Sequence, residues 1–431
     1  MNITVWGINY APELTGIGPY NQALCEHLSA NGHSVRMVTG FPYYPSWKKQ
    51  PADKRAIYRT ERMGNVTVHR CRQYVPRRPS GKTRILHELS FVAASFLRQL
   101  FLPRPDVMVV VSPPLLLGAA AWLLTLLKPA PFCFHVQDLQ PDAALGLGLL
   151  KRGWLTRALY ALEALAYRKA DRVSGISEGM LQAFASKGVP KLKIVYFPNG
   201  VTIPEPETIP RPGAFRDRNG IAKDVFLAAY SGNLGVKQGL DVLIEAARRM
   251  QTCKIRILIS GDGARRESLM RLVKNHGLEN VLMLPLQPEE HYREMLVDID
   301  LAVITQETGT GQFFFPSKLL RTLAFGKPVL TVADETSELS GALGMGRFGV
   351  NVEPNQPGRI ADAIQELSQQ SDLQKFGAAG RNFVQQFEFD RVLTDFEVML
   401  RRMRPQTLRQ YKTPSLWIIE RNDLRIQPQS D

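Results

Sequence analysis

The chain has 431 residues, enough for two domains that each bury a core, and its 44% hydrophobic content is that of a globular protein. Four widely spaced cysteines without a C-x-x-C motif argue against a disulfide framework or a thiolate metal site and suit a reducing compartment.

The net charge of +14 is uneven: residues 1–205 hold 25 Lys and Arg against 12 Asp and Glu, a net of +13, so the remainder contributes +1. This asymmetry predicts an anionic partner. Because no nucleic-acid-binding module is present, a membrane surface or a phosphorylated substrate fits better than nucleic acid, and a solvated basic face is the alternative.

The start of the chain has the pattern of a parallel α/β unit. An apolar run at 3–8 is followed by a Pro-, Gly- and Thr-rich turn at 11–19, a helical pattern, and a second β-branched run at 35–39. Gly16 and Gly18 lie where the strand passes into the helix, and the free N–H groups and dipole of such a helix start favour an anionic group. The segment therefore predicts a fold class and a binding loop together.

Strand patterns alternate with helical patterns through both halves of the chain. A Pro-rich polar stretch at 204–212 separates two such series and is predicted to be a linker. We predict an α/β fold with two Rossmann-like, doubly wound domains, residues 1–205 and 206–385, which face a central cleft and bind ligands beyond the carboxyl ends of their strands. The tail at 405–431 has weak periodicity and is expected to be loosely ordered. The predicted strands are 2–8, 35–39, 66–70, 107–112, 132–136, 172–175 and 194–197, then 226–231, 255–260, 281–284, 301–305 and 328–332.

Two apolar segments of the first domain bear on membrane contact. Residues 107–127 reach the roughly 20 residues of a membrane span, but Pro113 and Pro114 divide them into a strand and a separate helix. The helix predicted at 84–102 is amphipathic with basic ends, and it either lies on a bilayer or packs on the core. Met1 leads directly into a strand pattern, so no signal peptide is expected.

Three strand-to-helix turns of the second half are rich in Gly, Asn and Ser. They read SGNLGVKQG at 231–239, GDGARRES at 261–268 and QETGTGQFFFPSK at 306–318. Each turn alone is a weak signal, because many α/β turns contain Gly for backbone reasons. Together with FPNGV at 197–201 they are a strong signal for a site at the cleft.

Taken as a set, PELTGIGPY, GHSVRMVTGFPYYP, FHVQDLQPDAALGLG, FPNGV, YSGNLGVKQGLD, SGDGARRESL and PSKLLRTLAFGKPV resemble the family 4 retaining glycosyltransferases of GT-B fold, over about residues 1–400. The resemblance is closest to the branch that builds bacterial exopolysaccharide, O-antigen and colanic acid. It implies that the first domain binds the acceptor, the second binds a nucleotide sugar, and a terminal helix at 386–404 returns to the first domain. The implied reaction is transfer of a hexose-type sugar to a polyprenyl-diphosphate-linked glycan. The implied location is cytoplasmic and peripheral, at the inner face of the cytoplasmic membrane.

The second domain departs from the pattern of the wider family. Many members carry two glutamates eight positions apart, and this chain has Phe313 and Arg321 at those positions. Many members also carry an Arg and a Lys after the first strand of this domain, and this chain has Asn233 and Gln238 there. We therefore expect Lys318 and Lys237 to bind the donor phosphates, with backbone N–H groups near 232–235 and 309–311. Arg321 has an alternative interpretation as a surface helix residue. The predicted donor-binding residues are Gly232, Asn233, Lys237, Gln238, Gly261, Gly263, Gly311, Ser317 and Lys318.

The segment FHVQDLQPD holds the catalytic candidates. Asp138 lies just past a buried strand, where it would orient or deprotonate the acceptor hydroxyl, the alternative being a cap or a buried hydrogen bond. Asp142 is the second candidate. His135 is the third, and its apolar neighbours suit a core histidine equally well. The acceptor side of the cleft is predicted to include Thr15, Gly16, Gly18, Tyr43, Tyr44 and Asn199, the tyrosines either stacking on a sugar or packing their loop.

No cofactor and no metal are expected beyond the nucleotide-sugar co-substrate, whose base the sequence does not indicate. The D-x-D at 298–300 resembles a metal-binding motif, but it lies between a helix and a strand, where aspartates are common in turns. Two alternatives to a transferase stay open. One is a sugar-nucleotide 2-epimerase of the same two-domain shape, and the other is a non-catalytic partner that has lost the glutamate pair.

Overall fold

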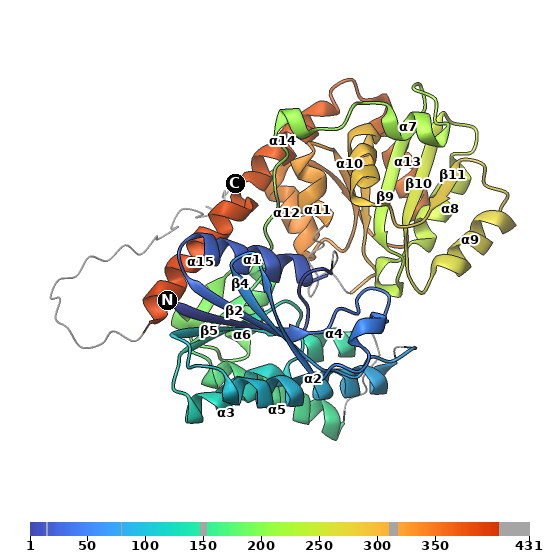
Figure 1. The fold of residues 1–431 in the computed structure, drawn as a ribbon. Helices are drawn as coiled ribbons and strands as arrows, with labels where there is room; N and C mark the ends of the chain where they lie inside the picture. The colour runs from blue at the N-terminus through green and yellow to red at the C-terminus, as the bar shows by residue number, and fades with distance from the viewer. Residues whose placement is uncertain (14–15, 79, 147–152, 310–317, 405–431) are drawn as a thin grey trace, which may run out of the picture.

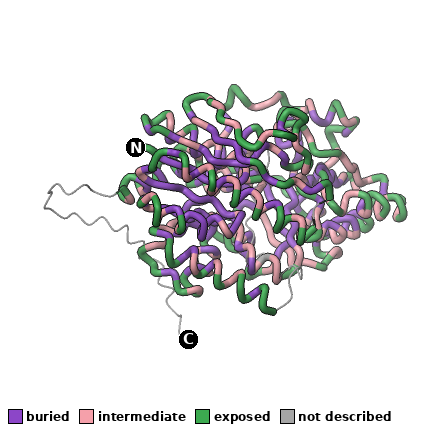
Figure 2. The backbone as a smooth tube through the Cα atoms, turned by 60° about the horizontal axis from the view of Figure 1, so that its bottom comes forward, coloured by how far each residue is buried: buried purple, intermediate pink, exposed green. Residues whose placement is uncertain are grey.

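The computed structural model describes residues 1–13, 16–78, 80–146, 153–309 and 318–404, and shows two α/β domains (Figure 1). Each domain is a sheet with helices on both faces, so the predicted fold class is confirmed. Figure 2 shows that the buried backbone concentrates in the interior of the molecule, with exposed residues around it. Of the predicted site residues, Thr15, Gly311 and Ser317 lie outside the described residues, as does Phe313.

The first domain contains an eight-stranded sheet in the order β3-β4-β2-β1-β5-β6-β7-β8, in which only the β3–β4 pair is antiparallel. The central strands are continuous apolar runs because helices cover both of their faces. The strands are β1 (Asn2–Trp6), β2 (Ser34–Gly40), β3 (Tyr58–Met63), β4 (Val66–Cys71), β5 (Val107–Ser112), β6 (Phe132–Val136), β7 (Arg172–Gly175) and β8 (Ile194–Tyr196). The α-helices are α1 (Gly18–Ala30), α2 (Gly81–Phe101), α3 (Leu116–Leu127), α4 (Gln140–Gly146), α5 (Trp154–Lys169) and α6 (Glu178–Ser186).

The second domain contains a six-stranded parallel sheet in the order β11-β10-β9-β12-β13-β14. Its strands are β9 (Phe226–Asn233), β10 (Ile255–Asp262), β11 (Val281–Leu284), β12 (Leu301–Thr305), β13 (Val329–Val332) and β14 (Gly349–Val352). Its α-helices are α7 (Ala214–Asn219), α8 (Asp241–Arg249), α9 (Arg266–Asn275), α10 (Glu289–Asp298), α11 (Lys318–Ala324), α12 (Glu338–Gly346), α13 (Pro357–Gln369) and α14 (Gln374–Val384).

The last described helix, α15 (Phe389–Met403), packs on the first domain beside α1 (Figure 1). Its apolar face belongs to the same core cluster as Ile3 and Leu24, and the ring of Phe396 stacks on Phe197 with 3.7 Å between centroids. Glu397 accepts hydrogen bonds from Asn31 at 2.7 Å and from Arg401. The chain therefore crosses between the domains twice.

Residues 107–127 form β5 and α3, separated by Pro113 and Pro114, as the proline pair predicted. Within the described parts of the chain, no helix has both the length and the apolar character needed to cross a bilayer. Helix α2 packs Phe91 and Val92 against the core, so the core-packing interpretation of this helix holds for one of its faces.

Candidate functional site

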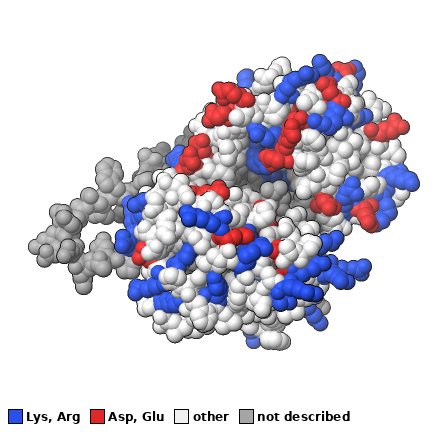
Figure 3. All heavy atoms as spheres, in the orientation of Figure 1, with Lys and Arg blue, Asp and Glu red and all other residues white. Residues whose placement is uncertain are grey.

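A groove is visible between the two lobes in Figure 3, and side chains that follow strands of each sheet interact electrostatically between the domains. Asp138 follows β6 in the first domain, and Lys237 follows β9 in the second. Burial raises the pKa of the Asp138 carboxyl and the charge of Lys237 partly offsets this rise, while burial lowers the pKa of Lys237 and Asp138 opposes that shift. The two side chains therefore lie close enough across the cleft to interact electrostatically. They bring a predicted catalytic residue and a predicted donor-binding residue together.

His135 lies within the sheet, with 2% of its surface exposed. Its Nδ1 is 2.9 Å from Ser174 Oγ and its Nε2 is 2.8 Å from Gln137 Nε2, and burial lowers the pKa of its imidazole to about 3. Gln137 also donates to Asn199 Oδ1 at 3.0 Å. This is the arrangement of a hydrogen-bonded core histidine, which orients Gln137 and Asn199 at the wall of a small pocket.

Asp142 points into an ion-pair cluster instead of the cleft centre. It accepts hydrogen bonds from Lys187 and from the hydroxyl of Tyr160, the latter at 3.1 Å. Lys187 also pairs with Glu163 at 2.7 Å, and Tyr167 donates to Glu163 at 3.0 Å. These contacts join α4, α5 and the end of α6. Asp142 therefore lies where a residue that stabilises the packing of these helices would lie.

A buried carboxylate joins the loop after β1 to the loop after β2 in the first domain. Glu13, in the loop after β1, accepts hydrogen bonds from the backbone N–H groups of Tyr43 and Tyr44, both at 3.0 Å, and from Asn9 Nδ2 at 2.8 Å. Burial raises the pKa of Glu13, and the donated hydrogen bonds oppose this rise. Gly16 has a positive φ of 72° and lies against the Tyr44 ring, so the predicted loop residues Gly16, Tyr43 and Tyr44 are brought together.

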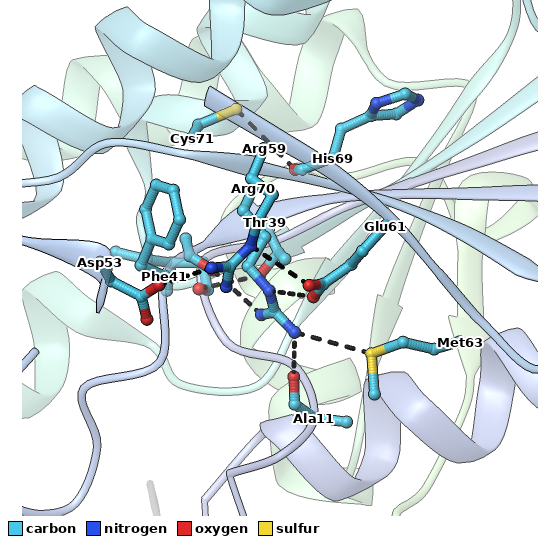
Figure 4. A network of polar contacts seen from close by, with 12 residues as sticks. Ala11, Thr39, Phe41, Asp53, Arg59, Glu61, Met63, His69, Arg70 and Cys71 are labelled. Atoms are coloured by element: carbon cyan, nitrogen blue, oxygen red, sulfur yellow. Dashed lines mark hydrogen bonds and ion pairs between the residues drawn. The ribbon is translucent and has the colours of Figure 1, made fainter. Parts of the chain in front are cut away.

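A second clamp on the same loops is the buried guanidinium of Arg70, shown in Figure 4. Its Nη2 donates to the carbonyl of Ala11 at 2.6 Å and its Nη1 to the carbonyl of Gly40 at 3.3 Å. Its Nε donates to Glu61 at 2.6 Å. The guanidinium therefore holds together the loop after β1 and the end of β2.

An aromatic cluster joins these loops to α2, which also carries a half-buried carboxylate. The rings of Tyr43 and His87 lie 4.5 Å apart, Trp47 lies 5.2 Å from Tyr43, and the guanidinium of Arg84 lies 5.4 Å above the Trp47 ring. One turn later, Glu88 accepts a hydrogen bond from Gln140 at 3.2 Å. The sequence motifs contained Glu13, and Arg84 begins the predicted amphipathic helix with basic ends, whereas no local pattern indicated the contacts of Arg70 and Glu88.

In the second domain, the glycine-rich carboxyl ends of β9 and β10 lie against each other. A Cβ on Gly261 would stand 1.8 Å from the carbonyl oxygen of Gly232, and one on Gly263 would stand 2.6 Å from that of Leu234. Only glycine permits this close approach, so the packing of the backbone alone is enough to require Gly261 and Gly263. Gly18 likewise lies against Glu13 at the start of α1.

The predicted backbone cradle is partly occupied by the protein itself. The N–H of Leu234 donates to Asp262 O at 2.8 Å, and that of Gly235 to Gln238 Oε1 at 3.1 Å. The N–H of Gly309 donates to Asp334 at 2.6 Å. Gln238 therefore closes its own turn in this structure, and Asn233 is exposed beside it.

Lys318, at the start of α11, is the most unusual cation of the site. Its Nζ lies 3.6 Å from the centre of the Tyr230 ring and next to Gly232, and burial lowers the pKa of its ammonium to about 7. The Tyr230 hydroxyl donates to the carbonyl of Asn233 at 2.7 Å, which fixes the ring. Among the described residues, no carboxylate lies within ion-pair distance of Lys318, whose ammonium packs on the Tyr230 ring.

The comparisons with known proteins agree with this geometry. Residues 15–200 match the glycosyl transferase 4-like domain and residues 213–383 match the glycosyl transferases group 1 domain. The protein named as colanic acid biosynthesis glycosyl transferase WcaI of Escherichia coli K12 is 36% identical over 347 residues, 79% of this chain and 85% of that protein. The chain belongs to the family 4 glycosyltransferases.

Solved structures show that this glycosyltransferase has the GT-B fold. Sucrose-phosphate synthase from Thermosynechococcus elongatus superimposes with a TM-score of 0.75 at 17% identity, covering 94% of this chain and 99% of the other. HepE of Anabaena, solved in complex with UDP-glucose, superimposes with a TM-score of 0.67 at 15% identity over 93% of this chain and 100% of its own.

Arg321, which stands where the resemblance led us to expect a glutamate, forms an ion pair with α10. The guanidinium of Arg321 donates to both carboxylate oxygens of Glu289 and lies 4.6 Å from the Tyr292 ring. The carboxylate of α10 therefore neutralises the substituted position. At the D-x-D, Asp298 accepts from the backbone N–H groups of Gly213 and Phe215, and Asp300 pairs with Arg216 at 2.6 Å, so both carboxylates hold α7 in place.

Proposed function

We propose that the glycosyltransferase moves a sugar, with retention of anomeric configuration, from a nucleotide sugar to a lipid-diphosphate-linked glycan in the synthesis of a bacterial surface polysaccharide. The relative WcaI is named for colanic acid biosynthesis, and HepE was solved with UDP-glucose. The observation that carries the proposal is Lys318, a half-buried ammonium over Tyr230 at the carboxyl edge of the second sheet. A diphosphate there would gain a strong charge-assisted contact because burial has removed competing water.

The proposed step needs little covalent chemistry from the protein. The acceptor hydroxyl oxygen bonds to the anomeric carbon, and the bond from that carbon to the diphosphate oxygen breaks with both electrons on the diphosphate. Lys318 and Lys237 would stabilise the departing charge. Asp138 would orient the hydroxyl, whose proton passes to the carboxylate or to the leaving diphosphate on the same face of the sugar.

The first domain supports a location at an anionic membrane. Figure 3 shows that Lys and Arg gather over this domain, whereas the second domain mixes both signs. The outer helices also expose large apolar side chains, with Leu126 64%, Leu127 65% and Trp154 80% exposed. Cations beside exposed apolar residues suit the interface of a bilayer, where both contribute to binding.

The test begins with purified protein and a melting-temperature screen against UDP-, GDP- and dTDP-sugars. We expect one nucleotide class to raise the melting temperature, and its radiolabelled sugar to enter the lipid extract of bacterial membranes and to be released by mild acid, as a glycosyl diphosphate should be. Stabilisation by no nucleotide sugar, together with no label in the lipid fraction, would overturn the proposal. Incorporation that is equally strong with heat-inactivated protein would do the same.

A further inference from the structure

The end of helix α2 lies at the amino-terminal edge of the first sheet, where its parallel strands begin. After Phe101 the chain leads directly into β5, and the ammonium of Lys128 donates to the carbonyl of Gln99 in the last turn of α2 at 2.8 Å. One turn earlier, Ser95 accepts a hydrogen bond from the indole of Trp6 on β1 at 3.0 Å. This contact fixes which part of the sheet the last turn of α2 covers.

The side chain of Arg36, on β2, points toward α2. Successive side chains of a strand lie on opposite faces of its sheet. Val38 packs in the same core cluster as Phe91 of α2, whereas Met37 packs in the cluster on the other face. Arg36 is two residues before Val38 and therefore shares its face.

Arg36 and Gln99 are directed at the same place between sheet and helix. Val38 pairs in register with Trp6, so Arg36 lies two strand residues, about 7 Å, from the Trp6–Ser95 contact toward the amino-terminal edge. Gln99 lies one helical turn, about 6 Å, from Ser95 in the same direction. Gln99 is also on the buried face of α2, with 4% of its surface exposed.

Both side chains carry a buried nitrogen atom for which the protein supplies no acceptor. Among the described residues, neither Arg36 Nη2 nor Gln99 Nε2 has a hydrogen-bond partner. Leaving a buried donor unpaired is costly, so such groups usually have a bound partner. Two of them at one place therefore indicate a ligand that accepts hydrogen bonds.

The charges around this place favour an anion over a neutral ligand. Burial, Arg98 and Arg36 together lower the pKa of His69 to about 4, and Arg36 adds to the effect of burial in lowering the pKa of Lys128. Arg98 donates to Thr60 Oγ1 at 2.9 Å, which holds it beside His69. Within the described part of the chain, these three cations form no ion pair with a carboxylate.

We infer that Arg36 and Gln99 bind a phosphate group between β2 and the end of α2, with Arg98 at its rim. The planar guanidinium can donate to two oxygens of a tetrahedral oxyanion and the amide to a third. Arg36 lies four residues, about 13 Å, before Gly40 at the carboxyl end of β2. The phosphate is therefore not that of the donor or the acceptor in the cleft, and the inference goes beyond the proposed function.

Titration calorimetry of the full chain with inorganic phosphate tests the inference. The titrations use the Lys318→Met background, so that this contact of the donor site does not contribute, and chloride holds the ionic strength constant. We expect Arg36→Met to weaken phosphate binding at least tenfold and Gln99→Leu several-fold. The matched control is Arg157→Met, which removes an exposed guanidinium from α5 of the same domain and should stay within twofold.

Melting temperatures separate a ligand site from a structural role of the two residues. Without phosphate, Arg36→Met and Gln99→Leu should melt at or above the temperature of their parent, because each removes an unpaired buried donor. Phosphate should raise the melting temperature of the parent and of Arg157→Met but not that of the two test variants. A large drop for Arg36→Met without phosphate would make its guanidinium a structural partner of α2 and overturn the inference.

Glycerol 3-phosphate tells a phosphate ester from free phosphate as the ligand. Binding as tight as that of phosphate would support the site as one for an ester, and binding of phosphate alone would support it as one for the free ion. Binding of neither, or equal losses in Arg36→Met and Arg157→Met, would overturn the inference. With Lys318 intact, Arg36→Met should keep the melting-temperature rise with the nucleotide sugar, which separates this failure from that of the proposed function.

Discussion

The carboxylate of Glu338, in the second domain, accepts a hydrogen bond at 2.5 Å from the backbone N–H of Gly179, in the first. The same oxygen accepts from the hydroxyl of Ser177 at 2.6 Å. A Cβ on Gly179 would stand 2.2 Å from that oxygen, so the contact depends on the absence of a side chain. Because the clashing atom is the end of a flexible side chain, an alanine at this position would displace Glu338 and leave the helix intact.

Gly179→Ala should therefore loosen the contact between the domains without unfolding either one. The matched control is Gly341→Ala in α12, because a Cβ there meets nothing within 4 Å. Alanine is favoured over glycine within helices by up to about 1 kcal/mol, so the control should gain stability. We expect Gly179→Ala to show no such increase in stability, because the lost Glu338 contact offsets it. The variant should also have a larger radius of gyration than wild type in small-angle X-ray scattering. If both variants match in stability and in radius, the Glu338 contact does not hold the domains together.

The charge of Lys318 should make donor binding depend on pH. Burial lowers the pKa of this group to about 7, so the unliganded protein holds an ammonium below pH 7 and loses it above. Binding a diphosphate requires the charged form, so protonation must accompany binding at higher pH. The dissociation constant of the nucleotide sugar should rise by up to tenfold per pH unit between pH 7 and 8.5 in titration calorimetry.

Lys318→Met should bind the donor more weakly at pH 7 and should show a flat profile over the same range. Lys237→Met is the informative comparison, because burial lowers the pKa of Lys237 too. A profile that stays steep in Lys318→Met and becomes flat in Lys237→Met would transfer the diphosphate contact to Lys237.

Most of the fold could be predicted because parallel strands covered on both faces are uninterrupted apolar runs. β5, β6 and β12 have the bounds expected from their sequences, ending where a polar residue or a proline follows. The strand β3 was missed because its sequence YRTERM is polar and half exposed, as an antiparallel edge strand permits. The strand β14, GVNV, was missed because it is short and only half buried.

Residues of the candidate site could be predicted where they directly follow a strand, because the carboxyl ends of the strands face the cleft. Asp138 and Lys237 come just after strands, so the topology alone sends them to the cleft. Glu88 and Arg70 acquire their roles from partners 52 and 59 residues away, Gln140 and the carbonyl of Ala11. No local sequence pattern predicts such a pairing, because it depends on where β4 lies in the sheet and on how α2 packs against the domain.

Asp138 and Asp142 should respond differently to removal of their charge. Asp138→Asn should lower kcat about 100-fold or more, because a general base or orienting carboxylate contributes on that order, while the donor dissociation constant changes little. Asp142→Asn should keep most of kcat and lose about 1 kcal/mol of stability, since Lys187 would retain Glu163 as a partner. Steady-state kinetics and urea unfolding measure the two effects. The reverse pattern would assign the chemistry to Asp142.

Arg70 should contribute more to the free energy of unfolding than its ion pair with Glu61 alone would, because it also donates to two backbone carbonyls. The guanidinium reaches two backbone carbonyls and Glu61 at once, which a lysine ammonium on a linear stem cannot do. Arg70→Lys should therefore cost about 2–4 kcal/mol in urea unfolding, because buried acceptors lose their donors. The control is Arg59→Lys on the neighbouring strand, whose side chain is 39% exposed while pairing with Asp53 and Glu61, and whose cost should stay within about 1 kcal/mol. Equal costs for the two variants would show that the guanidinium of Arg70 adds no more to the stability of the loops after β1 and β2 than a half-exposed ion pair does.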